Sequence, residues 1–582
     1  MKLRLLTIGL WTAGLLTACS DSGADMSSKP TTPAASSEVV SLPTDKVTCT
    51  PNDSEGTVTI WHSMSGPAAV DLWKGFELEF ERTHKARLEV LVFAGDKAII
   101  DRLETTPRDQ WPDLIDVSER NTLALLDTQQ FVPPVACDVS FGSDLLPLVR
   151  ATYSVNDVLV AAPFGVSTPV LIFDAAEFRA ANLDLAEPPL TLGSLLDASR
   201  AIADSGASPY GLVVTDACVG MVTDYFSAQR DVATDESIVG HEERTADVNF
   251  ATDENIADLT LLAQGVADGH IKYIGGSESN MDDLLELANS TDDGGSMTVH
   301  TSGSLGDIIR LLGNFPGVEL GVGPLPGPGV GAPVGGNAFW LTSNSDATQV
   351  GRAWSVVEWL YEAPQLARLA IETGYVPPTE SAAEVQELLD RWDQYPQLKV
   401  AYDQVRATAV TPGSIGSLVG PFNGRAIVLN RACDKIMANG ADVRETLLAA
   451  SEAVNELLAQ YEAQRLGQEL PEQVTTVSIE APTASAISGT VECASGAQVV
   501  GVWVEAEASP SQNSGWAAYQ TTSAAAASYQ FTLQYGGRYQ LHVGCGGTEN
   551  DWGSSSFTNF ISSSSDFLCH DVPPRRGVCD TL

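Results

Sequence analysis

Basic residues are scarce in this chain of 582 residues. Lys and Arg number 32 against 75 Asp and Glu, which gives a formal net charge of −43. Proteins that hold DNA or RNA present Lys and Arg to the phosphates, so the composition excludes a nucleic-acid partner. Because the acidic residues are dispersed along the chain, we interpret them as a solvated exterior rather than an interaction tail.

The signatures of common enzymes are also missing. The sequence has no Walker A sequence, no GxSxG nucleophile elbow and no HExxH helix. A carboxylate pair for glycoside hydrolysis can be chosen only arbitrarily among so many acids. We therefore expect no catalytic residue, no metal and no cofactor. The histidines, which have no metal-ligand spacing, are His62, His84, His241, His270, His300, His542 and His570.

The start of the chain is typical of an exported protein. Lys2 and Arg4 precede an apolar run that is short for a membrane span, and small residues follow before Cys19. The closing "LTAC" resembles the bacterial lipobox, whose cysteine is lipidated and becomes the mature N-terminus. We expect residues 1–19 to be a signal peptide and Cys19 to anchor the protein to the membrane on its extracytoplasmic side. Residues 20–56, rich in Ser, Thr, Pro and Ala, then form a flexible tether.

Eight cysteines remain after Cys19, and none of them forms a CxxC pair, which argues against zinc and thioredoxin-type sites. An even number outside the cytoplasm indicates disulfides. Four of the eight lie at the end of the chain. There we expect Cys493 to pair with Cys545 and Cys569 with Cys579, although the sequence alone does not define the connectivity.

Between residues 57 and 465 strands alternate with helices, which predicts an α/β fold, and the length of this region indicates two lobes. Residues 57–61 alternate as a strand, an apolar helical pattern runs from Pro67 to about Thr83, and a second strand begins at Leu88. This βαβ unit presents its first turn, "HSMSGP", at the carboxyl end of a strand, where ligands bind in such folds.

In that turn, His62, Ser63 and Ser65 are candidates for lining a ligand cavity, while helix capping explains Ser65 better. Helices dominate the end of the region. Pro364 is well placed to begin a helix, and Gly374 to cap its end. Further strands and helices are expected within residues 113–119, 167–174, 296–312, 317–327 and 347–374.

The pattern changes after residue 465. Residues 466–487 form an expected linker, and residues 488–582 are rich in Ser, Gly and alternating runs, which predicts a small all-β sandwich containing disulfides. Gly536 and Gly537 lie between two such runs and predict a hairpin turn. Three tryptophans, which suit either the core or a carbohydrate-stacking face, are better explained by core packing. They are Trp503, Trp516 and Trp552.

Four segments, in chain order, resemble one protein family. They are "WHSMSGPAAVDLWKGFELEFERTH", "APFGVSTPVLIFDAAEFRAANLDLAEPPLTLGSLLDASRAIADSG", "TSGSLGDII" and "GGNAFWLTSNSDATQVGRAWSVVEWLYEAPQLARLAIETGYVPPTESA". They are similar to the family 1 extracellular solute-binding proteins of ABC importers, and most of all to the glycerol-3-phosphate branch. The resemblance covers residues 57–465. It implies a periplasmic-binding-protein-like fold of two lobes joined by a hinge, which closes on a solute and docks on a membrane permease.

The resemblance also implies solute contacts at single positions. Glu119 in "LIDVSER" matches a glutamate whose two oxygens suit a vicinal diol. Ser167 in "PFGVSTPV" matches a serine that hydrogen-bonds the solute. Thr301, with Ser302 beside it, matches a hydroxyl just before a helix, where free N–H groups favour anions. The alternatives are a surface glutamate, a hydroxyl bonded to local backbone, and an ordinary N-cap.

Gly336 in "VGGNAF" matches a glycine that lets backbone approach the solute, and Tyr375 in "TGYVPP" matches a tyrosine. A turn glycine and a helix-cap contact are the respective alternatives. Arg425 in "FNGRAIV" presents a planar fork of donors that suits a phosphate, with a surface ion pair as the alternative. The chain departs from the branch in two places. Lys97, the eighth candidate for solute binding, stands where the branch has a tyrosine; it could add positive charge for the phosphate, with a side chain that points to solvent as the alternative. Residues 211–221 lack the tryptophans of the branch.

We therefore expect a monomeric, lipid-anchored, extracytoplasmic receptor that captures glycerol 3-phosphate or a glycerophosphodiester by lobe closure and performs no chemistry. An oligosaccharide receptor of an ABC importer is the main alternative. A secreted hydrolase and a cell-wall adhesin acting through residues 488–582 are the alternatives from other classes.

Overall fold

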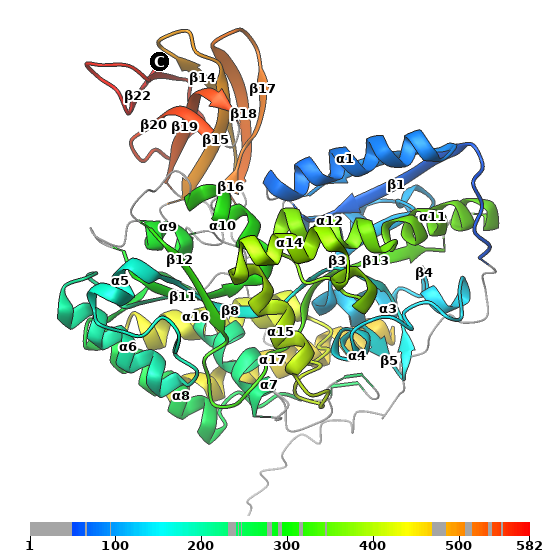
Figure 1. The fold of residues 1–582 in the computed structure, drawn as a ribbon, viewed down its shortest axis with the longest axis horizontal. Coiled ribbons are helices and arrows are strands. Elements are labelled where there is room, and N and C mark those ends of the chain that lie inside the picture. Colours follow the sequence, from blue (N-terminus) through cyan, green and yellow to red (C-terminus); the bar gives the residue numbers. More distant parts are fainter. Residues whose placement is uncertain are drawn as a thin grey trace, which may run out of the picture. The chain divides into compact units, whose positions relative to one another are not determined.

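The chain forms a mixed α/β part over residues 49–467 and a β-rich part over residues 485–582 (Figure 1). Cys19, Ser65, Gly536 and Gly537, with most of the expected linker, lie outside the residues that the structure describes. The computed structural model describes residues 49–64, 67–93, 95–230, 240–241, 244–245, 247–275, 282–288, 294–312, 318–343, 346–467, 485–506, 515–533, 538–548 and 551–582.

The first lobe is built around a sheet with the strand order β2-β1-β3-β13-β4, and β7 also pairs with β13. The expected βαβ unit is confirmed, because β1 and β2 pair in parallel with the helix α1 between them. The strands are β1 (Gly56–His62), β2 (Ala86–Val92), β3 (Leu114–Ser118), β4 (Phe131–Val132), β7 (Ala162–Ser167) and β13 (Gly335–Thr342).

Helices cover both faces of this sheet, so its inner strands are apolar on both sides. In β3, for example, Leu114, Ile115 and Val117 are all fully buried. Pro364 lies in the first turn of α12, and Gly374 ends that helix with a φ of 88°, both as expected. The helices are α1 (Pro67–Thr83), α2 (Asp96–Thr105), α3 (Thr122–Asp127), α4 (Pro147–Thr152), α11 (Ala347–Leu360), α12 (Ala363–Thr373), α13 (Glu380–Ala383), α14 (Gln386–Gln394) and α15 (Lys399–Ala407).

The second lobe contains a sheet of order β11-β8-β12 and the parallel pair β10-β9. A disulfide joins Cys218 of the π-helix η4 (Ala217–Phe226) to Cys433 of α16 (Phe422–Met437). The strands are β8 (Pro169–Asp174), β9 (Leu212–Val214), β10 (Ile271–Tyr273), β11 (Met297–Thr301) and β12 (Leu320–Pro324). The other helices are α5 (Ala175–Ala180), α6 (Leu192–Ser205), α7 (Ser227–Gln229), α8 (Asp253–Ala267), α9 (Asp282–Ala288), α10 (Leu305–Leu312) and α17 (Val443–Arg465).

The chain passes from the first sheet to the second at Thr168, the single residue between β7 and β8. Its backbone N–H donates to the Ser302 hydroxyl at 3.2 Å, and its carbonyl accepts from the Ser302 N–H at 2.9 Å. Its hydroxyl donates to the carbonyl of Pro333 at 2.9 Å, in the segment that leads back from β12 to β13. Thr168 therefore fixes the two crossing segments to each other and to the turn after β11.

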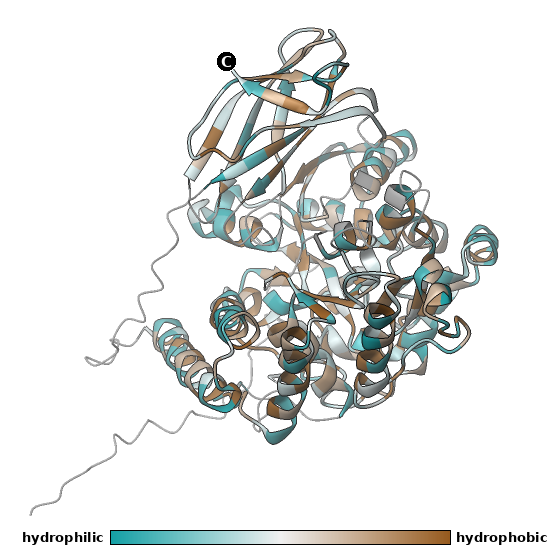
Figure 2. Ribbon diagram, turned by 90° about the vertical axis from the view of Figure 1, so that its left-hand side faces the viewer, coloured by the Kyte–Doolittle hydropathy of each residue, from teal (hydrophilic) through white to brown (hydrophobic). Residues whose placement is uncertain are grey.

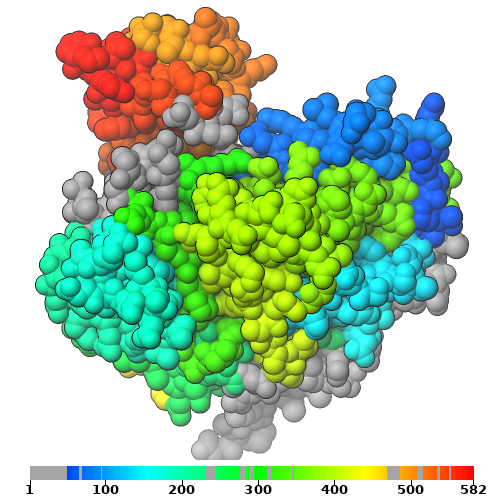
Figure 3. Space-filling model, viewed as in Figure 1, coloured from blue at the N-terminus to red at the C-terminus, as the bar shows by residue number. Residues whose placement is uncertain are grey.

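Gln404 of α15 completes this junction from the opposite side. Its amide NH₂ donates to the Thr168 hydroxyl at 3.1 Å and to the Pro169 carbonyl at 2.8 Å, and its carbonyl accepts from Leu325 N–H at 2.7 Å. The outer side chains of α14 and α15 lie on the surface (yellow-green in Figure 3), whereas Gln404 is buried. A buried amide with satisfied partners fixes geometry, because removal of one partner leaves the other unsatisfied.

The β-rich part forms one nine-stranded sheet of order β16-β15-β19-β20-β22-β21-β14-β18-β17. Hydrophobic and hydrophilic residues alternate along its strands (Figure 2). The sheet folds over a core of its own, as the predicted sandwich requires. Its strands are β14 (Ser485–Cys493), β15 (Val499–Ala506), β16 (Gly515–Trp516), β17 (Ala518–Thr521), β18 (Ala526–Leu533), β19 (Tyr539–Thr548), β20 (Asp551–Phe557), β21 (Phe567–His570) and β22 (Val578–Thr581).

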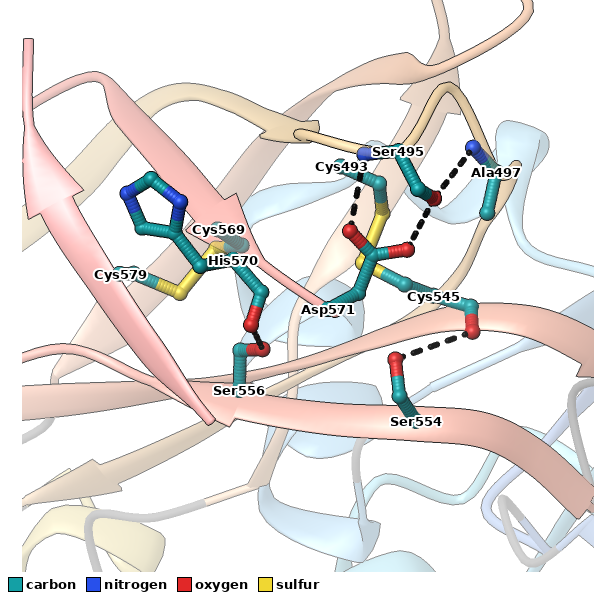
Figure 4. Close-up of a disulfide and its surroundings, with 10 residues drawn as sticks. All are labelled: Cys493, Ser495, Ala497, Cys545, Ser554, Ser556, Cys569, His570, Asp571 and Cys579. Atoms are coloured by element: carbon teal, nitrogen blue, oxygen red, sulfur yellow. Dashed lines mark hydrogen bonds between the residues drawn. A yellow bond between two sulfur atoms is a disulfide. The ribbon is translucent and has the colours of Figure 1, made fainter. Parts of the chain in front are cut away.

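Both disulfides expected here are confirmed: Cys493 pairs with Cys545, and Cys569 with Cys579 (Figure 4). Two other expectations are wrong. The strands β18 and β19 do not form a hairpin, because β18 pairs with β14 and β17 while β19 pairs with β15 and β20. The three tryptophans are not part of the core: Trp516 is 46% exposed, Trp503 and Trp552 are half-buried, and Trp503 lies on the face of β15 opposite the buried Val502 and Val504.

Candidate functional site

The crossing between the two sheets brings six of the eight candidate residues together. Ser167 ends β7 directly before the crossing residue, and its backbone is paired with Gly335, next to Gly336. Thr301 is paired with Pro169 at the start of β8, and Ser302 bonds the crossing residue itself. The strand β3 also ends here, because Ser118 is paired with Asn337 of β13. Carboxylates, hydroxyls and backbone N–H groups from both lobes therefore gather at this point.

Gly336 is held in a conformation that favours glycine. Its φ is 107°, and a Cβ there would lie 2.0 Å from the carbonyl oxygen of Gly165. Its N–H donates to Glu119 Oε2 at 2.8 Å, and its carbonyl accepts from the Tyr153 hydroxyl at 2.6 Å. Gly336 therefore does more than form a turn, because its backbone also orients the side chains of Glu119 and Tyr153.

Glu119 lies at the carboxyl end of β3, in the short turn η2 (Glu119–Asn121), and its side chain is 16% exposed. Burial raises the pKa of its carboxyl to about 7, and the guanidinium of Arg120, 3.7 Å away, acts in the opposite direction. The carboxylate oxygens point to the Gly335–Gly336 backbone. A carboxyl that titrates near neutral pH can both donate to and accept from hydroxyl groups.

A second carboxylate, Asp116, lies two residues before Ser118 on the same strand and is fully buried. Burial raises its pKa to about 8, while the hydrogen bond from Asn337 Nδ2, at 3.2 Å, acts to lower the pKa. Asn337 also donates to Ser63 at 2.8 Å, and Ser63 donates to Asp96 at 2.6 Å. Ser63 was predicted to line a ligand cavity, whereas Asp96 and Asp116 were not predicted, although a charged residue inside the apolar strand "LIDVS" was a usable signal.

The turn after β11 is capped by a candidate residue and covered by another. The Thr301 side chain accepts from the Gly303 N–H at 3.4 Å, which confirms that it is an N-cap, here of the short turn η5 (Ser302–Ser304). The ring of Tyr375 lies against Gly303, where a Cβ would be 2.5 Å from Tyr375 Cε1. Burial raises the pKa of the Tyr375 hydroxyl, so it remains a neutral donor. Ser302 instead forms hydrogen bonds with Thr168, the residue at the crossing.

Arg425 lies in the first turns of α16 and is only 3% exposed. Its Nη2 donates to Asp224 Oδ1 at 2.6 Å and to the Thr223 hydroxyl at 3.1 Å. Its guanidinium carbon lies 5.7 Å from the ring centre of Phe422 and 5.6 Å from that of Phe250. Its Nε is buried without a hydrogen-bond partner among the described residues. The alternative interpretation, an ion pair with a carboxylate, does occur, but with the arginine buried rather than on the surface.

Arg120 connects the two ends of the site. It lies 3.7 Å from Glu119 and 4.0 Å from Asp224, and its guanidinium stands 4.9 Å from the ring centre of Phe422. Charges therefore alternate in sign from Glu119 of the first lobe through Arg120 and Asp224 to Arg425 of the second. Arg120 and Asp224 were not predicted, because only the folded chain brings them together.

Lys97, the last of the eight, and His62 of the first turn are not among the residues that meet at the crossing. Lys97 lies on the exposed face of α2 and bonds Asp101 within the same helix at 2.5 Å. His62 is fully buried and stacks on Trp73, with ring centres 4.8 Å apart. Burial lowers the pKa of His62 to about 3, so the ring is neutral and packs as an apolar group. Among the described residues no group of three or more His, Cys, Asp and Glu side chains is arranged to hold a metal ion.

The profile of one family, described as bacterial extracellular solute-binding protein, matches residues 78–400. The chain belongs to this family. The sn-glycerol-3-phosphate-binding periplasmic protein UgpB of Rhizobium meliloti is 25% identical over 415 residues, 69% of this chain and 93% of that protein. The UgpB of Salmonella typhimurium is 23% identical over 425 residues, 70% of this chain and 93% of that protein.

Solved structures of solute-binding proteins have the same fold. UgpB from Mycobacterium tuberculosis, in complex with glycerophosphocholine, aligns with a TM-score of 0.56 at 17% identity, over 70% of this chain and 100% of that one. The cyclic α-maltosyl-1,6-maltose-binding protein of Arthrobacter globiformis aligns with a TM-score of 0.55 at 18% identity, over 70% of this chain and 99% of that one. The expected two-lobed fold is confirmed.

The protein is thus a solute-binding protein of an ABC importer. Proteins of this kind bind small solutes outside the cytoplasm, work with permease subunits and are not enzymes, in agreement with the resemblance found in the sequence. In the described part of the chain, none of the helices has both the length and the apolar character needed to cross a membrane.

Proposed function

We propose that the protein is a lipid-anchored extracytoplasmic receptor that captures glycerol 3-phosphate or a glycerophosphodiester by closing its lobes. The observation that carries this proposal is the row of alternating charges that joins Glu119 of the first lobe to Arg425 of the second through Arg120 and Asp224. A solute with a diol at one end and a phosphate at the other matches the two ends of this row.

The chemistry of each end supports the assignment. Glu119 accepts hydrogen bonds from the two glycerol hydroxyls, while the Gly336 N–H keeps its carboxylate in place. Arg425 exchanges its bond to Asp224 for one to a phosphate oxygen. Its buried Nε, which has no hydrogen-bond partner among the residues that the structure describes, supplies a further donor. Ser167, Thr301 and Tyr375 supply neutral hydroxyl groups between these ends.

Lobe closure follows from this division of the contacts. Because Glu119 belongs to the first lobe and Arg425 to the second, a solute that touches both stabilises the arrangement in which the lobes are close. Lys97, which is exposed and paired with Asp101 in this structure, remains a candidate for the phosphate if that pair opens on lobe closure.

The domain organisation remains a proposal as well. Residues 1–19 are the signal peptide and Cys19 carries the lipid. The tether was expected to reach residue 56, but Cys49 is buried and joined to Cys137 of the first lobe by a disulfide, so we propose that it ends before Cys49. Residues 57–465 form the solute-binding part, residues 466–487 the linker and residues 488–582 the disulfide-containing β domain. In this arrangement a monomeric receptor stands away from the membrane that holds its permease.

A neutral oligosaccharide is the second candidate solute. It is favoured by the excess of acids at the site, where Asp96, Asp116 and Glu119 lie near one another while Asp224 already neutralises Arg425. Each ionised carboxylate here repels a phosphate dianion, whereas sugar hydroxyls form hydrogen bonds with a carboxyl group in either protonation state. A phosphodiester, with one negative charge, lies between the two cases.

Calorimetric titration of the protein, begun after Cys19, distinguishes these solutes. Glycerol 3-phosphate, glycerophosphocholine and a maltooligosaccharide are titrated in parallel into wild type and Arg425→Ala. The proposal predicts saturable binding of a phosphate compound that is lost in the variant. Binding of the sugar alone, unchanged in the variant, would move the protein to the carbohydrate branch, and product formation at catalytic protein concentration would reveal a hydrolase.

A further inference from the structure

A row of large side chains crosses the outer face of the β-rich part. Trp516 is paired with Trp503, Trp503 with His542, and His542 with Phe557, so these residues lie directly opposite one another on β16, β15, β19 and β20. Val578 of β22 continues the row beside Phe557. Neighbouring strands lie about 4.8 Å apart, so the row is roughly 19 Å long.

A further indole is built into this face. The ring of Trp552 lies against two glycines, where a Cβ on Gly501 would be 2.6 Å and one on Gly544 2.3 Å from its ring atoms. Its ring centre is 5.8 Å from that of Trp516, which in turn is 5.3 Å from that of Trp503. The glycines on β15 and β19 thus make room for an aromatic ring that would otherwise be displaced from the sheet.

Exposed apolar side chains flank one pair of hydrogen-bonding side chains in the middle of the row. The exposed fractions are 46% for Trp516, 47% for Phe557 and 40% for Val578. Between the aromatic residues, His542 Nε2 lies 2.6 Å from Glu505 Oε2, and these side chains are 30% and 40% exposed. The row therefore combines flat apolar surfaces with a polar pair that remains in contact with solvent.

The opposite face of β15 and β19 packs in the core of the β-rich part. Val502, Val504, Leu541 and Val543 are fully buried there, and a disulfide joins Cys545 of β19 to β14. The shape of the row is thus fixed before any ligand binds, which reduces the entropy that binding costs.

We propose that this row is a binding site for a neutral polysaccharide, which lies across the strands with its sugar rings on Trp516, Trp503 and Phe557. Sugar rings have an apolar C–H face and hydroxyl edges, and the row offers aromatic faces beside a carboxylate and an imidazole. The net charge of −43 and the position of Glu505 oppose an acidic polymer or an anionic membrane.

A protein partner or a second copy of the chain fits the row less well. A dry protein interface would remove water from the pair of Glu505 and His542 in the middle of the row, and burying such charges is costly. A polysaccharide leaves the carboxylate and imidazole free to exchange hydrogen bonds between sugar hydroxyls and water. This activity would be separate from solute capture by residues 57–465.

Affinity electrophoresis of the whole chain tests the proposal. Native gels contain soluble starch, dextran, laminarin or hydroxyethylcellulose, each a neutral polysaccharide, with alginate as an acidic comparison. We expect at least one neutral polymer to retard wild type, with the dissociation constant raised tenfold or more in Trp516→Ala and in Phe557→Ala. Trp516→Phe, which keeps an aromatic face, should retain part of the retardation.

The control is Leu78→Ala, which truncates an apolar side chain that is 73% exposed on α1, far from these strands in sequence. It should be retarded like wild type. Failure of all four neutral polymers to retard wild type, or equal retardation of Trp516→Ala, would overturn the proposal. So would a sedimentation experiment in which wild type is a dimer and Trp516→Ala a monomer, because the row would then join two copies of the chain.

Discussion

The guanidinium of Arg425 is paired with the carboxylate of Asp224 at 2.6 Å, in a part of the second lobe where the arginine is almost completely buried. Asp224 therefore already binds the guanidinium to which the proposed phosphate would bind. An ion pair that is partly shielded from water holds its partners tightly, so a solute has to supply an equivalent acceptor before Arg425 is released.

Replacing Arg425 by Ala is expected to weaken a phosphorylated solute by about 1.5–3 kcal/mol, or roughly 10- to 150-fold in dissociation constant, because a hydrogen bond to a charged group is lost. Titration calorimetry measures the loss. The matched control is Arg444→Ala, since Arg444 is an exposed arginine paired with Asp253 on the surface. Equal affinities for wild type and Arg425→Ala would contradict the assignment.

The stability of the first lobe should fall as the pH rises from about 4 to about 8. Burial raises the pKa of Asp116 to about 8 and that of Glu119 to about 7, so the folded chain binds more protons than the unfolded chain over this interval. The stabilisation is complete below the unfolded pKa values and is lost as the pH passes the folded ones.

Asp116→Asn removes the larger of these two effects and should flatten the change in urea midpoint between pH 5 and pH 8. Asp197→Asn is the control, because Asp197 is an exposed carboxylate. A wild-type midpoint that rises over this interval, or an Asp116→Asn variant with the full wild-type dependence, would show that the buried carboxyl does not titrate as described.

Arg244 joins the two lobes in this structure. Its guanidinium donates to both carboxylate oxygens of Asp127, at 2.9 and 2.8 Å, and to Glu462 at 2.8 Å. Asp127 ends α3 of the first lobe, whereas Glu462 lies on α17 of the second. Arg244→Met should therefore shift the chain toward separated lobes, which small-angle scattering detects as a larger radius of gyration.

The matched control is Arg200→Met, because Arg200 is an exposed arginine that pairs with Asp197 within α6 of the second lobe. An unchanged scattering profile for Arg244→Met would mean that the ion pairs of Arg244 do not hold the lobes together.

The disulfide between Cys218 and Cys433 ties η4, which carries Asp224, to α16, which carries Arg425. Replacing both cysteines by Ala should lower the stability by about 2–5 kcal/mol and also weaken solute binding, since the two helices are no longer fixed to each other. Urea unfolding and titration calorimetry measure these effects.

Replacing Cys569 and Cys579 is the control, because that bridge closes a loop of only 10 residues in the β-rich part. It should leave solute affinity unchanged. Equal solute affinity in both double variants would mean that the Cys218–Cys433 bridge does not support the solute site.

Much of the fold was predictable because the first lobe follows local rules. The β1-α1-β2 unit, the helix start at Pro364 and the cap at Gly374 all depend on apolar spacing and on backbone preferences of single residues. The hairpin at residues 536–537 was wrong for a different reason. Two alternating runs joined by glycines fit a hairpin locally, but the order of the sheet is decided by strands far away in the sequence.

The candidate site was predictable only in part. The resemblance indicated Glu119 and Gly336, which the structure joins by a hydrogen bond. The pairing of Arg425 with Asp224, and the link through Arg120, depend on long-range folding that no local pattern reveals. The outward position of Trp516 likewise depends on the register of β16 against β15.

The central claim is that Glu119 and Arg425 hold the two ends of one solute. A crystal structure of the chain with glycerophosphocholine tests this claim most directly. The account predicts the glycerol hydroxyls on Glu119 and a phosphate oxygen within hydrogen-bond distance of Arg425, with the Asp224 bond broken or shared. A solute bound without contact to Arg425, while that residue remains paired with Asp224, would contradict it.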